Sequence, residues 1–518
     1  MKFDNVMRLL GEFGTYQKRN YLLVCLPVIT ISIQTMISVF TLGVPEHRCA
    51  LPQWENDTYA VQNSFHHQQI NLSIPLVTYP SSDEEKMSKC ELFGVYNSKA
   101  NMTNNSTTYT YKCQSYVYEK TDFETTFVTE MNLVCQKKSY RTHAMMAFMG
   151  GFTFGSLALG IVADGFGRKK GLMLSLVLHI GSCIAVSFAN GFLLFVVLRF
   201  IAGISVGGIL GITFVMGLEL VGPSKRMWAG IVIEFFWSFG TLLLALLAFF
   251  VREWHHLQLV LSIPTVLFLS YAWFIPESAR WLLTKGRDLE ADHILRKAAK
   301  VNKVELPEKL FDEETFESEK CVPVWKIFIS FRLMMRTLII FLNWMVTSMV
   351  FYGLGLNVGN LGGNIYINYF FSSIAETIGF ASCLLFLNRW GRKPMHVGSM
   401  LLGGLACLGT IFPVIYGSTD QQWITVTLAM IGKLGASAAF ATIWVFSAEL
   451  YPTIVRNSAM GASSFCARVG GMISPYIADI GISVEGDMAK AMPLIIFGMA
   501  TIGNFKIRYT RNTRLSAA

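Results

Sequence analysis

The stretch Gly160-Ile-Val-Ala-Asp-Gly-Phe-Gly-Arg-Lys-Lys170 lies between two long apolar runs of the chain. About 220 residues later, Asn388-Arg-Trp-Gly-Arg-Lys-Pro394 again separates two apolar runs and repeats the glycine followed by Arg-Lys. Gly165 and Gly167 in the first copy favour a tight turn, because glycine adopts positive φ without strain. The repeat therefore predicts two equivalent turns, each at a membrane face.

A second pair of motifs recurs in the same order. An acid and an arginine stand seven positions apart in Glu219 to Arg226 and again in Glu449 to Arg456, each time after an apolar run. Two motifs that recur at similar offsets indicate an internal duplication. We therefore expect two similar halves.

The composition is that of a membrane protein. Of 518 residues, 53% are hydrophobic and 15% are charged, whereas soluble proteins carry about 25% charged residues. Apolar runs of roughly 18 to 25 residues suffice to span a hydrocarbon core of about 30 Å. Such runs predict an all-α membrane protein with eleven spans and a short twelfth, near 21–44, 143–163, 171–189, 192–218, 228–251, 256–275, 336–357, 365–387, 396–416, 423–447, 458–481 and 490–504.

The formal net charge of +9 does not indicate nucleic-acid binding, because the basic residues follow the positive-inside rule. Lys and Arg gather in alternate short loops, such as 168–170 and 389–393. The loops between them, around Asn190, 357–364 and 418–422, contain neither residue. The terminal segments 1–20 and 505–518 are therefore predicted to face the cytoplasm.

Residues 45–142 form a polar insertion that the same rule places outside the cell. Its even number of cysteines predicts two disulfides in an oxidising compartment, and three pairings remain open. It also contains N-x-S/T sequons, the last two of which overlap. The predicted disulfide cysteines are Cys49, Cys90, Cys113 and Cys135, and the predicted glycosylation sites are Asn56, Asn71, Asn101, Asn104 and Asn105.

The rest of the chain divides into two bundles, 21–275 and 336–504, joined by a charged linker at 276–335. The linker opens with Pro276-Glu-Ser278, as in a first helical turn, and Gly286 marks a helix end, so a helical cytoplasmic segment is predicted. Only about 13 residues from Met492 onward are continuously apolar, against the roughly 20 of a full span. We expect a short last helix.

The repeated charges lie at one membrane face and suit ion pairing, because Arg offers a carboxylate two donors. We expect a layer of charge pairs that locks the two halves on the cytoplasmic side and breaks when that side opens. The alternative, that these charges only orient the helices, remains open. The predicted cytoplasmic gate comprises Asp164, Arg168, Glu219, Arg226, Arg392, Glu449 and Arg456.

Charged residues inside the spans cost about 2.5–3.5 kcal/mol each to insert, and they usually face a cavity or a partner. Arg199 is expected to be structural, whereas Glu234 and Glu376 are candidates to contact a cation. Lys433 and Arg468 suit an anionic group or pairing with these acids. Because aromatic faces attract cations, the deeply placed Trp237 and Tyr352 join the set. The predicted substrate contacts are Glu234, Trp237, Tyr352, Glu376, Lys433 and Arg468.

The sequence contains no HExxH, no nucleophile elbow and no phosphate loop, and its cysteines lack metal-ligand spacing. We therefore expect no enzyme activity, no metal and no cofactor. Glycines at a spacing of four instead predict close helix packing; they are Gly151 and Gly155 in one span and Gly203, Gly207 and Gly211 in another.

Several stretches resemble a known family. The motif Gly160-x-x-x-Asp-x-x-Gly-Arg-Lys, its weaker second copy and Pro276-Glu-Ser-x-Arg-Trp-Leu resemble the major facilitator superfamily. Other stretches resemble, within it, the organic cation, organic anion and carnitine transporter family of solute carriers. They are Gly11-Glu-Phe-Gly-Thr-Tyr-Gln17, Gly43-Val-Pro-Glu-His-Arg-Cys49, Asn132-Leu-Val-Cys135 and Glu449-Leu-Tyr-Pro-Thr453.

The resemblance implies a 12-helix (6+6) major facilitator fold that alternates access to a central site. It places Glu234, Tyr352 and Glu376 at substrate-contacting positions, and Arg468 where anion and carnitine carriers have Arg and amine carriers have Asp. The sequence departs from the family pattern at Gly165, which replaces Arg, at Asn388, which replaces Asp, and in lacking a closing Pro-Glu-Thr.

We therefore expect a multi-pass plasma-membrane transporter of small organic cations or zwitterions such as carnitine-like quaternary amines. Its partners are the substrate, the bilayer and a coupling ion that the sequence does not identify, with no nucleic acid. Two alternatives remain. One is an organic anion exchanger that relies on Arg468 and Lys433, and the other is a transport-inactive variant with a truncated last helix.

Overall fold

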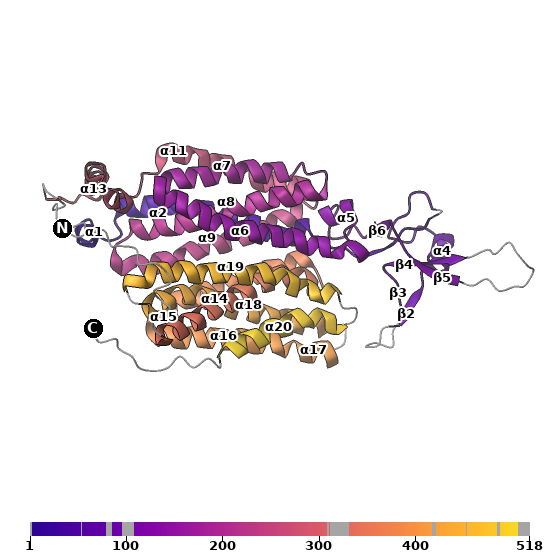
Figure 1. Ribbon diagram of the computed structural model, residues 1–518. Coiled ribbons are helices and arrows are strands. Elements are labelled where there is room, and N and C mark those ends of the chain that lie inside the picture. The colour runs from indigo at the N-terminus through magenta and orange to yellow at the C-terminus, as the bar shows by residue number, and fades with distance from the viewer. Residues whose placement is uncertain are drawn as a thin grey trace, which may run out of the picture.

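The computed structural model describes residues 3–52, 54–78, 85–95, 108–307, 310, 331–416, 421–451, 453–483 and 487–505. Long helices lie side by side in one body, and a small domain with short strands projects from one end of it (Figure 1). We name this domain the insert (residues 45–137) and the end of the body that carries it the insert end. The other end is the turn end, where the N-terminal helix α1 (Phe3–Leu9) lies (Figure 1).

The first half of the body holds the first six of the ten helical stretches that, within the described residues, are long and apolar enough to cross a membrane. The last of the six is divided into two α-helices and a 3-10 helix around Pro264, because proline donates no backbone hydrogen bond. The elements are α2 (Thr15–Met36), α3 (Ser38–Thr41), α6 (Lys138–Phe166), α7 (Arg168–Val186), α8 (Phe192–Leu220), η2 (Pro223–Lys225), α9 (Arg226–Phe250), α10 (Trp254–Ser262), η3 (Ile263–Ser270) and α11 (Tyr271–Phe274).

The second half is also a bundle of long helices. Its last helix, α20, is longer than the apolar segment Met492–Thr501 that it contains. The final helix has 19 residues, which at about 1.5 Å per residue approaches the thickness of a hydrocarbon core. Its Leu494 and Phe497 are fully buried. The elements are α14 (Phe331–Asn357), η5 (Val358–Asn360), α15 (Ile365–Trp390), α16 (Arg392–Gly409), α17 (Ile411–Tyr416), α18 (Gln422–Leu450), α19 (Thr453–Ser483) and α20 (Asp487–Phe505).

The two repeated turns adopt the same local structure. Gly167 stands alone between α6 and α7 with φ +119°, and Gly391 stands alone between α15 and α16 with φ +88°. A side chain at either position is strained, which explains why glycine recurs there. Gly165, in contrast, lies inside α6 without a positive φ, so the prediction that both glycines form the turn is wrong for Gly165.

The insert consists of three two-stranded antiparallel ribbons and short helices, held by two disulfides. Cys49 bonds Cys113 and Cys90 bonds Cys135, which confirms two disulfides and selects one of the three pairings. The ribbons are β1 (His47–Cys49) with β6 (Tyr116–Tyr118), β2 (Leu76–Thr78) with β3 (Glu85–Met87), and β4 (Glu91–Val95) with β5 (Thr108–Lys112); the helices are α4 (Ser64–Ser73), α5 (Phe127–Met131) and η1 (Cys135–Lys137).

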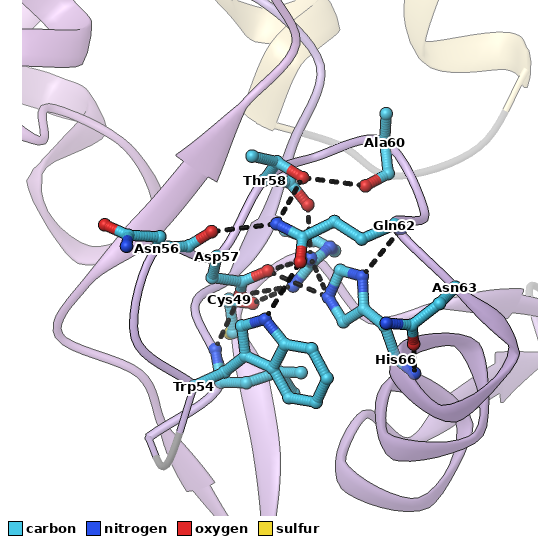
Figure 2. Close-up of polar contacts among 11 residues, drawn as sticks. Cys49, Trp54, Asn56, Asp57, Thr58, Ala60, Gln62, Asn63 and His66 are labelled. Carbon is cyan, nitrogen blue, oxygen red and sulfur yellow. Dashed lines mark hydrogen bonds and ion pairs between the residues drawn. The ribbon is translucent and has the colours of Figure 1, made fainter.

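A buried polar cluster fixes the loop between β1 and α4 (Figure 2). Arg48 donates from both terminal nitrogens to the two oxygens of Asp57, at 2.9 and 2.5 Å, and His66 Nε2 lies 3.0 Å from Asp57 Oδ1. The ring of His66 also stacks on Trp54.

Two of the five predicted glycosylation sites lie within the described residues. Asn56 and Asn71 are exposed on the insert, as a glycan requires. Asn101, Asn104 and Asn105 lie outside the described residues.

The first part of the linker packs against the first half at the turn end. It forms α12 (Ala279–Thr284) and α13 (Asp288–Asn302), with Ser278 capping α12 and Gly286 at φ +69° after it. The cluster of buried side chains that joins these helices to α1 contains Phe3, Val6, Met7, Leu10, Trp281, Leu282, Leu283, Ala291, Leu295, Ala298, Ala299 and Leu310. The rest of the linker, 311–330, lies outside the described residues.

Candidate functional site

A cavity of about 170 Å³ lies between the two halves. The first half contributes residues of α2, α6, α8 and α9, and the second half contributes residues of α14, α18 and α19. Four of the predicted substrate contacts line it: Glu234, Trp237, Tyr352 and Arg468.

Glu234 and Arg468 give the cavity one acidic and one basic side chain. No ion pair joins Glu234 to another described residue, so its carboxylate is available to a ligand. The Arg468 guanidinium lies 4.0 Å from the ring centre of Phe152 and donates a 3.4 Å hydrogen bond from Nη1 to the Tyr352 hydroxyl. Arg468 Nε is buried without a partner among the described residues. The cavity therefore offers a carboxylate and a guanidinium with a free donor.

Aromatic rings form much of the remaining wall. Phe351 and Phe440 stack with centroids 4.7 Å apart, and Tyr352 meets Phe440 edge to face. Toward the turn end, Phe214 of α8 contacts Trp444 of α18 across the boundary between the halves, with centroids 4.9 Å apart. Phe214 and Phe440 were not predicted, because an aromatic residue in an apolar span gives no signal that separates cavity from lipid.

Glu376 and Lys433, also predicted as substrate contacts, pair with each other instead of lining the cavity. Lys433 Nζ lies 3.0 Å from Glu376 Oε2, 3.1 Å from the Phe351 carbonyl oxygen and 3.9 Å from the centre of the Phe351 ring. Both side chains are only 3% exposed, and Glu376 Oε1 is buried with no hydrogen-bond partner among the described residues. The structure thus divides the predicted contacts into four cavity residues and one buried ion pair behind Phe351.

Arg199 lies inside the first half, apart from the cavity. It donates to the Gln34 carbonyl oxygen and to the Ser38 hydroxyl, and its guanidinium lies 4.3 Å from the ring centre of Phe148. These contacts connect α8 to α2 and α6, as a structural role requires.

The predicted gate charges at the turn end pair within each half. Arg168 contacts Asp164 and, at 3.5 Å, Glu219; Arg392 Nε donates to Glu449 at 2.8 Å. The lock between the halves that the repeat suggested is therefore not formed by these described pairs, because each joins helices of the same half. The side chain of Arg456 lies outside the described residues.

The linker and α1 make further polar contacts with the charged residues at the turn end of the first half. Glu277 accepts hydrogen bonds from the backbone N–H of Lys169 and of Ser278, and the Ser278 hydroxyl donates to Glu219 at 2.6 Å. Arg226 pairs with Asp4 of α1 at 2.6 Å. These contacts fasten the linker and α1 to the turn between α6 and α7, to the end of α8 and to the start of α9.

Ion pairing between the halves occurs at the insert end, where it was not predicted. Arg141 of α6 donates to Asp479 of α19 at 2.8 Å, and the Thr142 hydroxyl donates to the same carboxylate. The charged side chains are 7% and 13% exposed. Each lies near the end of an apolar run, where a charge is usually solvated, so the sequence alone does not single them out.

Comparison with known proteins identifies the family. Residues 93–505 match the family described as "Sugar (and other) transporter". The chain is 38% identical to "Organic cation transporter protein" of Drosophila melanogaster, over 97% of this chain and 90% of that protein. It is 30% identical to human "Organic cation/carnitine transporter 2", over 96% and 89%.

A solved structure of the xylose transporter XylE from E. coli, in a partially occluded inward open conformation, has the same fold. It superposes with a TM-score of 0.61 at 14% identity and covers 95% of this chain and 97% of its own. The protein is therefore a multi-pass membrane transporter and not an enzyme. The chain belongs to the sugar (and other) transporter family of the major facilitator superfamily, within its organic cation, organic anion and carnitine transporter branch.

Proposed function

We propose that the protein carries small organic cations and zwitterions, such as carnitine-like quaternary amines, across the plasma membrane by alternating access. The observation that carries this proposal is the joint presence of Glu234 and Arg468 in one aromatic cavity. The names of the relatives, organic cation transporter and organic cation/carnitine transporter, support the same substrate class.

Each group of the cavity suits one part of such a molecule. A carboxylate attracts a protonated or quaternary nitrogen, and the rings of Trp237 and Tyr352 add cation–π attraction of up to about 2 kcal/mol when the cation is desolvated. A guanidinium binds a carboxylate through two parallel hydrogen bonds. Glu234 would therefore hold the ammonium end of a zwitterion and Arg468 its carboxylate. Broad aromatic walls fix no exact shape, which favours loose specificity.

The contacts between the halves support alternating access. Arg141 and Asp479 close the insert end, whereas the described charge pairs of the turn end stay within each half. The cavity residues Phe214 and Trp444 lie near the ends of α8 and α18 at the turn end. In this conformation the substrate would exchange with the turn end once the rings of Phe214 and Trp444 separate. The positive-inside rule assigns this end to the cytoplasm.

The same rule places both termini in the cytoplasm and the insert outside the cell. Two disulfides and the exposed sequons at Asn56 and Asn71 support this orientation. Glycosidase treatment of the protein from cell membranes should raise its mobility on a gel, and replacing both asparagines by glutamine should reduce that change.

Uptake of three labelled compounds tests the substrate class: tetraethylammonium, carnitine and a dicarboxylate, each with and without sodium. The wild type should take up the first two. Glu234→Gln should lower tetraethylammonium uptake about tenfold or more, since the cation loses its counter-charge, whereas Glu234→Asp should retain part of it. Arg468→Gln should lower carnitine uptake and spare tetraethylammonium.

One alternative rests on a specific observation, the guanidinium of Arg468 in the cavity. An organic anion exchanger would take up the dicarboxylate in preference and would be insensitive to Glu234→Gln. A transport-inactive variant would take up none of the three compounds. Against inactivity, α20 is packed into the second half, where the Phe497 ring lies directly on Gly353.

A further inference from the structure

Among the residues that the structure describes, each glycine that borders the cavity leaves open space where a side chain would stand. These glycines are Gly211 of α8 and Gly461 of α19, one from each half. Both are exposed, and a Cβ added at either position would meet no neighbouring atom within 4 Å. We propose that Gly211 and Gly461 set the largest ammonium group that the cavity accepts, so that the protein takes nitrogens with ethyl or longer chains as well as trimethylammonium groups.

Packing between helices does not explain these two glycines, although it explains others on the same helices. A Cβ added at Gly203 of α8 would lie 2.2 Å from the Phe148 carbonyl oxygen, and one at Gly470 of α19 would lie 2.0 Å from that of Met345. Inside a helix, glycine is otherwise unfavourable relative to alanine. The two open glycines share instead a place on the cavity wall, where bare helix backbone enlarges the space for a ligand.

The open glycines lie at the depth of Glu234, the carboxylate to which the proposed function assigns the ammonium. Gly461 is eight residues from the turn-end start of α19, Glu234 is eight from that of α9, and Gly211 is nine from the turn-end terminus of α8. At a rise of 1.5 Å per residue, all three lie about 12–14 Å along their helices. In a cavity of about 170 Å³, the chains of a nitrogen held by Glu234 would therefore lie close to the open positions.

Arg468 would hold the opposite end of a zwitterion. It follows Gly461 by seven residues, so it lies on the same face of α19 and about 10 Å farther from the turn end. A zwitterion with its carboxylate on Arg468 would extend its ammonium toward Gly461. The glycines therefore act on the size of the ammonium end, and Arg468 acts on the carboxylate end.

A competing explanation also calls for small residues at these positions. When the turn end closes, α8 and α19 approach each other from opposite halves, and bare backbone would let them meet. Larger side chains would then slow the transport of every substrate to the same degree. A limit on size distinguishes between substrates instead, because one methylene group more or less in a pocket changes selectivity by about 10–200-fold.

The test compares the uptake of labelled tetramethylammonium and tetraethylammonium, which carry the same charge and differ only in the length of their chains. Initial rates are normalised to protein at the cell surface. Gly211→Val and Gly461→Val should each lower the ratio of tetraethylammonium to tetramethylammonium uptake about tenfold, mainly by raising KM for the larger cation. Gly181→Val in α7 and Gly398→Val in α16 are matched controls, because an added Cβ there also meets no atom within 4 Å but stands outside the cavity lining. Both should leave the ratio unchanged.

An unchanged ratio in both cavity variants, or an equal fall in the uptake of both cations, would overturn the proposal. If a valine variant does not reach the surface, Gly211→Ala and Gly461→Ala add less volume and should lower the ratio about threefold. Absence of these alanine variants from the surface as well, while both controls arrive there, would contradict the open space at the two glycines and overturn the proposal too.

This inference rests on the proposed function, but the two fail separately. A wild type that takes up neither cation and no carnitine contradicts the proposed function. A wild type that takes up tetramethylammonium or carnitine but excludes tetraethylammonium contradicts only the size limit assigned to Gly211 and Gly461, and so does a ratio that is insensitive to both glycines.

Discussion

Asp57 of the insert holds its place through charge-assisted hydrogen bonds. Burial alone would raise the pKa of its carboxyl, but hydrogen bonds from Arg48, from the backbone N–H of Leu51 and from His66 hold the pKa below its ordinary value. His66 Nδ1 receives the backbone N–H of Gln62, which leaves Nε2–H to donate to Asp57. A carboxyl whose pKa is lowered by folding stabilises the fold above its ordinary pKa and loses that contribution as the pH falls.

This linkage predicts acid sensitivity of the insert. Its resistance to proteolysis in the full-length protein should be constant at neutral pH. It should fall as the pH drops below about 4, the ordinary pKa of an aspartate, toward the lower pKa of Asp57 in the folded insert. Asp57→Asn should lower the free energy of unfolding of the insert by roughly 3 kcal/mol already at pH 7, because Arg48 then stays buried without its counter-charge. The insert should then be cleaved faster at that pH. The control Glu46→Gln removes an exposed pair with Lys89 and should change stability by less than about 1 kcal/mol. Equal effects of both substitutions would contradict this account.

At the scale of single residues, the sequence predicted the cost of buried charge and gave pairing of Lys433 with an acid as one alternative, but it did not decide between that pairing and contact with the substrate. Mid-span position alone pointed to Glu234, Glu376, Lys433 and Arg468, because a charge in a span needs a cavity or a counter-charge. Whether Glu376 meets Lys433 or the cavity depends on the rotation of α15 against α18. Rotation is set by packing between helices, which a single sequence does not encode locally.

Among the elements, α6 and α8 approach closely, and glycine makes this possible. A Cβ added at Gly155 would lie 2.0 Å from the Ile204 carbonyl oxygen, and one at Gly203 would lie 2.2 Å from that of Phe148. The predicted close packing by Gly151, Gly155, Gly203 and Gly207 is therefore present. Gly211, the next in the series, has no atom within 4 Å of such a Cβ and borders the cavity instead.

Gly155→Ala should consequently destabilise the protein by about 1–3 kcal/mol, because the backbones of α6 and α8 must separate to admit the methyl group. Gly160→Ala is the matched control on the same helix, since nothing lies within 4 Å of its added Cβ. This control should be neutral or slightly stabilising. Thermal unfolding of the purified protein in detergent measures both, and a similar loss of Tm in the two variants would be inconsistent with the packing described.

The repeated turns were predictable because a positive φ requires a particular residue, and that residue is visible in the sequence. Gly167 and Gly391 carried this signal in both halves. The length of α20 was less predictable, since its apolar core is shorter than the helix that contains it. Hydropathy measures the part of a helix that suits lipid, whereas hydrogen bonding determines where the helix ends.

For the whole molecule, the distribution of ion pairs defines which end is closed. Arg141 and Asp479 connect the halves through α6 and α19 at the insert end. The repeated motifs led us to predict a lock between the halves at the turn end. A duplicated motif, however, is expected to make the same contact within each half. A contact between halves joins different helices and therefore leaves no repeated signature. The two-halved fold was predictable from the duplication, whereas the side on which it closes was not.

Asp479→Asn should weaken this closure and favour the conformation that is open at the insert end. We expect faster reaction of a cysteine placed at Tyr352 with a membrane-impermeant thiol reagent applied to the side of the membrane that carries the insert, because the reagent then reaches the cavity more often. In the same background, Glu449→Gln removes a pair within the second half and should leave the rate unchanged. A rate that Asp479→Asn does not alter would exclude Arg141 and Asp479 from closure.

The packing of α1 against α12 and α13 has a consequence for how the chain is made. Domains tend to fold as they leave the ribosome, beginning with the N-terminal part. Here α1 finds its buried partners only after residues 279–302 have been synthesised, when the six spans of the first half are already complete. Docking of α1 therefore requires the first half and the start of the linker to be present.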